Sequence, residues 1–254
     1  MNSEILSEIK KKREFSQLPD IDIELAYNHF EKRQADNGEK IRLTWELLRK
    51  IFNAFVSKKL LSLKNKDEEW ILRKHASTRE RLPYYIEIYK KIFKDYKKAR
   101  IIDLGAGING FSYGFFKKLG INVDYTAIES VGQLVDLMNF YFKEKKLAGK
   151  AIHLSLFEKK KVLDIISHEK PPRIVLLFKI IDALESLKRD YSMELILDIA
   201  KTAERLVLSF PTKSLGSREK FHANRKWIVD FLENNFKNQL VIPCCRAKCV
   251  SYSD

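Results

Sequence analysis

A glycine-rich turn follows a short apolar segment in IIDLGAGING, residues 101–110. Gly105, Gly107 and Gly110 have the spacing G-x-G-x-x-G, between an expected strand and an expected helix. Because glycine has no side chain, such a turn lets a ligand come close to the backbone. The spacing alone is weak evidence, and it fits a nicotinamide dinucleotide equally well.

Two acidic residues accompany this turn. Asp103 stands two residues before Gly105, where its carboxylate can order the loop or meet the ammonium of an amino-acid ligand. Glu129 ends the next expected strand and is placed to accept hydrogen bonds from ribose hydroxyls. Together with a helical segment before the turn and an added strand at the end of the sheet, these acids favour S-adenosylmethionine over a dinucleotide. If the turn bound no ligand, the presence of an acidic residue at the end of the next strand, Glu129, would be coincidental.

The chain before the turn is predicted to be helical. Apolar residues recur at helical spacing in the segments 5–15, 21–33, 39–63, 68–76 and 82–96. Asp20 is the expected N-cap of the second helix, Asn37-Gly38 interrupts the pattern, and Pro83 fits the first turn of the last helix. We therefore expect an all-helical N-terminal domain over residues 1–98.

From residue 99 onward, strands and helices are expected to alternate. Expected strands cover 100–104, 123–130, 150–157, 173–181, 205–211, 239–247 and 248–254, and expected helices cover 111–120, 131–146, 192–203 and 224–236. Such alternation predicts a parallel sheet with helices on both faces. The final pair of adjacent strands predicts an antiparallel hairpin at its edge. The second domain, residues 99–254, is thus expected to be a Rossmann-like α/β domain.

The charge of the chain indicates a polyanionic partner. Its 254 residues carry a formal net charge of +14. Lys and Arg side chains release counterions when they neutralise phosphates, which favours nucleic acid. The alternative is a Lys-rich surface that is simply solvated.

The cysteines and the apolar segments bear on the cellular compartment. Cys244, Cys245 and Cys249 form an odd set in one short tract, which favours a reducing cytoplasm and ordinary strand residues rather than a disulfide framework or a metal site. No apolar run reaches the roughly 18 residues of a membrane span, and the N-terminus has no apolar region typical of a signal peptide. We expect a cytoplasmic protein without a metal ion or a membrane partner.

Three further stretches resemble one family. HASTRERL at residues 75–82 is similar to a signature of the aminoglycoside-resistance 16S ribosomal RNA methyltransferases, the guanine-N7 enzymes of the Arm/Kgm, FmrO-like group. SFPTKSLGSREK at 209–220 resembles the family's FPxKSLxxR loop, and IVLLFKIIDALESL at 174–187 resembles its LLLK segment with the helix that follows. The resemblance covers roughly residues 70–240, in order.

This resemblance implies a helical domain that docks on the small ribosomal subunit and a domain that binds S-adenosylmethionine. It implies that Arg81 pairs with the methionine carboxylate, while Glu80 and His75 orient that Arg or cap its helix. The implied cofactor-binding residues are His75, Arg81, Asp103, Gly105, Ala106, Gly107, Glu129, Ser155, Leu156 and Lys179, of which Lys179 would line the pocket. The implied RNA-binding residues are Lys213, Ser214, Arg218 and Lys220.

The implied reaction needs little acid–base chemistry. Guanine N7 has a free lone pair and loses no proton on attack, so no general base is expected. Catalysis would depend on holding N7 in line with the methyl group, and the target base is expected to flip out of its stack. This sequence departs from the family pattern at Gly110, where a Pro usually follows Asn109, at Glu129, which is usually Asp, and at Ser155, where an acid is common near the adenine.

Other functions remain open from the sequence. They are a methyltransferase of a different RNA site, a catalytically silent protein that binds RNA or the ribosome, and an NAD enzyme. The fourth expected strand is not followed by an N/D-P-P-Y/F motif, which disfavours adenine-N6 chemistry. The cysteines lie on the terminal hairpin, away from the position of a cytosine-C5 nucleophile. A monomer is expected.

Overall fold

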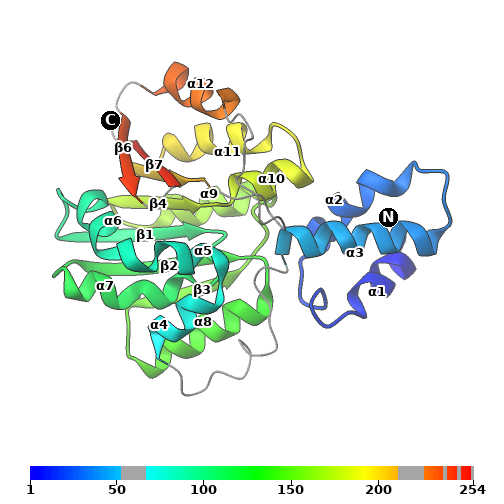
Figure 1. Ribbon diagram of the computed structural model, residues 1–254, viewed down its shortest axis with the longest axis horizontal. Coiled ribbons are helices and arrows are strands. Elements are labelled where there is room, and N and C mark those ends of the chain that lie inside the picture. The colour runs from blue at the N-terminus through cyan, green and yellow to red at the C-terminus, as the bar shows by residue number, and fades with distance from the viewer. Residues whose placement is uncertain (53–66, 211–225, 237–238, 245–246, 253–254) are drawn as a thin grey trace.

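The computed structural model describes residues 1–52, 67–210, 226–236, 239–244 and 247–252. Three helices, α1 (Ser3–Lys10), α2 (Asp20–Glu31) and α3 (Asn37–Phe52), form a lobe beside one end of a sheet (Figure 1). Apolar side chains of all three, such as Ile9, Ile23 and Leu48, are fully buried. This lobe and one face of the sheet share a continuous apolar core.

The ends of these helices differ from the prediction. The first helix ends at Lys10, although Phe15 is still buried. Pro19 rather than Asp20 is the N-cap of α2, because its extended backbone (φ −56°, ψ 142°) directly precedes the first helical turn. The helix α3 begins at Asn37, two residues before the start of the predicted helix over 39–63.

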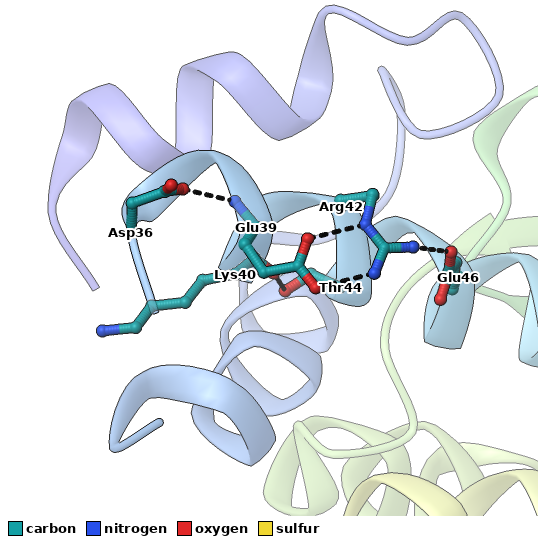
Figure 2. Close-up of polar contacts among 6 residues, drawn as sticks. All are labelled: Asp36, Glu39, Lys40, Arg42, Thr44 and Glu46. Carbon is teal, nitrogen blue, oxygen red and sulfur yellow. Dashed lines mark hydrogen bonds and ion pairs between the residues drawn. The ribbon is translucent and has the colours of Figure 1, made fainter. Parts of the chain in front are cut away.

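The solvent side of α3 carries its own charge network. Asp36 Oδ1 accepts a hydrogen bond from the Glu39 amide at 2.8 Å, which satisfies one free N–H at the helix start. Arg42 pairs with Glu39 through Nε and Nη2, both at 2.7 Å, and with Glu46 through Nη1 (Figure 2). Because two acids, Glu39 and Glu46, pair with this one guanidinium, we do not expect this side of α3 to contact phosphates.

Three further helices lead from the lobe onto the sheet. They are α4 (Glu68–Lys74), α5 (Ala76–Arg81) and α6 (Tyr85–Ile92), with a single 3₁₀ turn (Leu82–Tyr84) before α6. The predicted helix over 68–76 is divided at His75, whose backbone is extended (φ −108°, ψ 129°). Tyr89 of α6 stacks on Phe116, with ring centroids 4.1 Å apart. The stack holds α6 against the sheet domain.

The sheet has the predicted parallel part and the predicted terminal hairpin. Its strands are β1 (Lys98–Leu104), β2 (Asn122–Glu129), β3 (Gly149–His153), β4 (Arg173–Phe178), β5 (Arg205–Ser209), β6 (Gln239–Cys244) and β7 (Ala247–Tyr252), in the order β3-β2-β1-β4-β5-β7-β6. The strands β1 to β5 pair in parallel, and β7 pairs antiparallel with both β5 and β6. The fourth strand ends at Phe178 rather than 181, because Lys179 turns into the left-handed region (φ 61°).

Helices cover both faces of the sheet (Figure 1). They are the 3₁₀ turn η2 (Asn109–Ser112), α7 (Tyr113–Lys118), α8 (Gly132–Glu144), α9 (Lys159–His168), α10 (Ile181–Leu187), α11 (Tyr191–Ala200) and α12 (Lys226–Asn235). Neighbouring strand residues such as Ile101 and Ile102 point into two different cores, as the period of a strand requires. Helix α9 was not predicted, although Val162 and Ile166 have helical spacing and are buried.

The strand order fixes where a ligand can bind. From β1 the chain proceeds outward to β2 and β3 on one side, and returns to β4 and β5 on the other. In such open sheets, ligands bind outside the carboxyl ends of the strands, where the order reverses. That point lies between β1 and β4, and Gly105 is the first residue after β1. Among the described residues, no helix is long and apolar enough to cross a membrane.

Two glycines allow a matched test of this turn. Gly105 has φ +65°, and a Cβ there would lie 2.6 Å from Ile180 Cδ1, whereas a Cβ on Gly114 in α7 would meet nothing within 4 Å. We predict that Gly105→Ala lowers the free energy of unfolding by about 2–4 kcal/mol, from left-handed strain and overpacking. Gly114→Ala should raise it by about 0.5–1 kcal/mol. Urea unfolding followed by circular dichroism measures both, and equal effects would contradict the assigned turn geometry.

Candidate functional site

The glycine turn is held against the end of β2. Gly105 and Gly107 have φ angles of +65° and +57°, in the region that glycine favours. The amides of Gly105 and Ala106 donate to the Ile128 carbonyl, at 2.9 and 3.2 Å. Glu129 Oε2 accepts from the Gly107 amide at 2.8 Å, and its Oε1 accepts from the Val131 amide at 2.9 Å. Glu129 therefore positions the turn as well as facing the site.

One buried amide connects the turn to the N-terminal helices. Asn109 Oδ1 accepts hydrogen bonds from Tyr85 Oη at 2.7 Å and from Arg81 Nη2 at 3.2 Å. Asn109 Nδ2 donates to Asp103 Oδ2 at 2.7 Å and to Tyr125 Oη at 3.3 Å. These four bonds use all the donors and acceptors of the amide. Arg81 and Asp103, which carry opposite charges, are thereby held on opposite sides of it.

Arg81 is a buried cation with hydrogen-bonding capacity to spare. Its side chain is 3% exposed, donates from Nη1 to Ser77 Oγ at 2.6 Å, and lies with its guanidinium carbon 4.7 Å from the centre of the Phe178 ring. Its Nε has no hydrogen-bond partner among the described residues. A guanidinium has five N–H donors in a planar fork that matches a carboxylate. Arg81 can therefore bind a ligand carboxylate without losing its present bonds.

Three buried carboxyl groups lie along the same end of the sheet. Burial raises the pKa of Asp103 to about 6, that of Glu129 to about 7 and that of Asp22, from helix α2, to about 6. Asp103 Oδ1 and Asp22 Oδ2 have no hydrogen-bond partner within the described part of the chain. Buried polar atoms in this state are costly, so this arrangement favours a ligand rich in N–H or O–H donors.

Glu80 does not orient Arg81, whereas His75 has the second predicted position, at the start of the helix that carries Arg81. Glu80 forms an ion pair with Lys179 instead, and Ser77 and Asn109 orient Arg81. His75 stands at the N-cap of α5, but its side chain makes no capping hydrogen bond. Its ring lies against the turn, since a Cβ on Gly107 would be 3.3 Å from His75 Nε2. Burial and the charges of Arg81, Lys179 and Arg79 lower the pKa of His75 to about 3, so the imidazole is neutral.

The residues after β3 and β4 lie near the same edge of the sheet. Ser155 is fully buried, and its Oγ donates to Asp22 Oδ1 at 2.6 Å. Leu156 contributes its side chain to the core beneath α9 and α11, and its carbonyl accepts from Tyr191 Oη at 2.5 Å. The Lys179 amide donates to the Ser209 carbonyl at 2.9 Å, which joins the ends of β4 and β5.

Some predicted site residues lie outside this description, and some site residues were missed. Lys213, Ser214, Arg218 and Lys220 fall in the segment 211–225, outside the described residues, and their RNA-binding role stays a prediction. The sequence pattern did not indicate the central position of Asn109 or the contribution of Asp22. The position of Asp22 was a usable signal, because it shares the buried face of α2 with Ile23 and Ala26.

Comparison with known proteins adds to this geometry. Residues 45–233 match the family model described as ribosomal RNA methyltransferase (FmrO). A 16S rRNA (guanine(1405)-N(7))-methyltransferase from Frankia casuarinae is 31% identical over 153 residues, which make up 59% of this chain and 50% of the relative. The chain thus spans about half the length of the curated relatives it matches.

Solved structures support the fold. The 16S rRNA methyltransferase RmtF, in complex with S-adenosyl-L-homocysteine, aligns over 100% of both chains with a TM-score of 0.77 and 20% identity. The 16S rRNA methylase RmtB aligns over 100% of this chain and 99% of its own, with a TM-score of 0.74 and 18% identity. The α/β methyltransferase fold expected from the sequence is therefore confirmed. With the family model covering most of its length, the chain belongs to the FmrO family of ribosomal RNA methyltransferases.

Proposed function

We propose that the chain is an S-adenosylmethionine-dependent methyltransferase that modifies guanine N7 in the decoding site of small-subunit rRNA. Family membership supports the reaction class. The name of the Frankia relative supports the target atom, and the S-adenosyl-L-homocysteine in the RmtF structure supports the cofactor. The observation that carries the proposal is the pairing of Arg81 with Asp103 across the Asn109 amide.

This pairing fits the amino-acid end of the cofactor. A methionine-like group carries a carboxylate and an ammonium on one carbon, so it needs a cation and an anion close together. Arg81 offers N–H donors to the carboxylate, and the unbonded Asp103 Oδ1 offers an acceptor to the ammonium. Because both residues are buried, the two interactions occur at low dielectric, where they are stronger than in water.

The neighbouring residues fit the nucleoside. The two oxygens of Glu129 each accept one backbone hydrogen bond, and each keeps a second lone pair for a ribose hydroxyl. Gly105, Ala106 and Gly107 present backbone without large side chains. His75 packs against the turn as a neutral ring, and Lys179, just after the end of β4, is held in an ion pair with Glu80.

The proposed reaction requires the chain to position the cofactor and the target base, and it requires no proton transfer. When bound, S-adenosylmethionine supplies an electrophilic methyl group on a sulfonium sulfur. Guanine N7 carries a lone pair and no proton, so no residue has to act as a general base. The buried carboxyls hold positive charge and hydroxyl groups, and Arg81 fixes the opposite end of the ligand. Orientation of this kind is a recognised source of rate enhancement.

The RNA partner is supported by charge. The net charge of +14 favours a phosphate-rich partner, and we propose that the N-terminal residues 1–98 dock on the small subunit. Lys213, Ser214, Arg218 and Lys220 are proposed to contact the target base and its phosphates. A cytoplasmic, monomeric enzyme remains our expectation.

The test of this function is a methylation assay with purified protein, labelled S-adenosylmethionine and isolated small ribosomal subunits, beside naked rRNA. Strand scission at N7-methylguanine maps the label. We expect label at one decoding-site guanine. Label elsewhere would keep the enzyme class and favour the alternative of a different RNA site. Absence of cofactor binding would leave a catalytically silent RNA-binding protein.

Arg81 and its neighbour Arg79 give a matched pair. We predict that Arg81→Ala weakens S-adenosyl-L-homocysteine binding about 10–100-fold, because a charge-assisted bond to a carboxylate contributes about 1.5–3 kcal/mol. Arg81→Lys should recover part of this affinity, since it keeps the charge and loses the fork. Arg79 is exposed on the same helix, and Arg79→Ala should bind as the wild type does. Titration calorimetry measures the affinities, and equal losses at both positions would contradict the assignment.

The buried carboxyls predict a pH dependence. The pKa values of Asp103 and Glu129 are raised to about 6 and 7, so both groups are largely protonated at pH 5 and lose that protonation as the pH rises. Only the carboxylate forms attract the ammonium and sulfonium charges. Affinity for S-adenosylmethionine should therefore rise by at least about tenfold from pH 5 to pH 7. Asp103→Asn should flatten the dependence, and calorimetry that finds stronger binding at pH 5 would refute it.

A further inference from the structure

Helix α2 brings a carboxylate to the end of the sheet from outside the α/β domain. Asp22, in its first turn, is 1% exposed. Its Oδ1 accepts the Ser155 hydroxyl at 2.6 Å, while its Oδ2 is buried without a hydrogen-bond partner among the described residues. The hydroxyl of Ser130 lies near enough to lower the pKa of Asp22, against the larger effect of burial. Asp22 therefore lies between the segments that follow β2 and β3.

Asp22 lies next in the series of strand ends to which the parts of the proposed cofactor are assigned. The amino-acid end is assigned to β1, through Asp103, and the ribose to the end of β2, through Glu129. The Leu154 amide donates to the Glu129 carbonyl at 3.1 Å, so Ser155 begins one step farther along the same edge. Neighbouring strands are about 4.8 Å apart. The base, which extends from the ribose away from the amino acid, is then expected beside Ser155 and Asp22.

A purely structural role for Asp22 explains the contact of only one of its two carboxyl oxygens. The bond from Ser155 to Oδ1 is sufficient to join α2 to the segment after β3. It gives no reason for the second oxygen, Oδ2, which is buried with no hydrogen-bond partner among the described residues even though the Ser130 hydroxyl is nearby, an unfavourable condition for a carboxylate oxygen. A ligand with an N–H donor at this point removes that cost. Burial is the main cause of the raised pKa of Glu129, and the charge of Asp22 adds to it, so the two carboxyl groups are near each other.

We propose that Asp22 Oδ2 accepts a hydrogen bond from the exocyclic amine of the cofactor's adenine, so that helix α2 completes the base-binding part of the site. The inference rests on the proposed function and adds to it the residue that selects a 6-aminopurine. The helical lobe, through this contact, becomes part of the cofactor pocket. A base with a carbonyl oxygen at this position would face a carboxylate oxygen and be repelled.

The experiment compares two ligands on the full-length chain. S-adenosyl-L-homocysteine carries the amine, and S-inosyl-L-homocysteine carries a carbonyl oxygen in its place. Wild-type protein should bind the amine form at least about tenfold more tightly, as one buried hydrogen bond is worth about 1.4 kcal/mol. Asp22→Asn keeps an oxygen for Ser155 and supplies an N–H to the carbonyl. The preference should fall to about twofold or reverse.

Two control variants separate recognition from folding. Asp20 lies in the same helical turn with a side chain that is 59% exposed, so Asp20→Asn should keep the wild-type preference. Ser155→Ala removes the tie to α2 and retains the acceptor, so it should weaken both ligands alike and keep their ratio. An unchanged ratio in Asp22→Asn would overturn this inference alone. No binding of S-adenosyl-L-homocysteine by the wild type would overturn the proposed function itself, and this inference with it.

Discussion

The orientation of a single side-chain amide, that of Asn109, determines how this site is assembled. Its oxygen faces two donors and its nitrogen faces two acceptors, so rotation by half a turn would break all four bonds. The partners come from α5, α6, β1 and β2. A helix that precedes the sheet domain in the chain is thereby fixed to the glycine turn within it. Because the whole network is buried, each bond is expensive to leave unmade.

The buried charges at this end of the sheet are unbalanced in a way that a ligand can correct. Asp22, Asp103 and Glu129 are all at least nine-tenths buried, and burial raises the pKa of each. On the opposite side, Arg81 carries a buried positive charge with an unbonded Nε. Because their pKa values are raised to about 6 or 7, these acids hold more protons near pH 6 than ordinary carboxyl groups do. A ligand that brings both positive and negative groups can replace those protons, which links binding to proton release.

Much of the fold was predictable, because strand and helix periods are local properties. The sheet, the terminal hairpin, the glycine turn and the end of β2 at Glu129 all follow from patterns within about ten residues. Helix α9 was missed between two strong strand patterns. The exact helix ends at Pro19, Asn37 and His75 depended on capping and on a single extended residue, which periodicity does not report.

The detailed contacts of the site depend on residues far apart in the chain. Asp22 and Ser155 are separated by 133 positions, and Lys179 and Glu80 by 99. No local pattern predicts such pairs. Glu80 was therefore predicted to orient Arg81, its neighbour in the motif, although its charge partner is Lys179. The family resemblance supplied Arg81 itself. Its supporting bonds, from Ser77 and Asn109, became evident only from the packing of α5 on the turn.

Helix α2 is fastened to the α/β domain at two points. Asp22 bonds to Ser155 near its first turn, and His29 Nε2 contacts the Leu187 carbonyl at 3.1 Å near its last turn. These attachments are seven residues apart, or about 10 Å along a helix. Two such contacts resist both sliding of α2 along the domain and rotation about either contact, so a displacement of α2 would also move the segments after β3 and at the end of α10. The lobe and the segment after β3, where the adenine is proposed to bind, are therefore mechanically coupled.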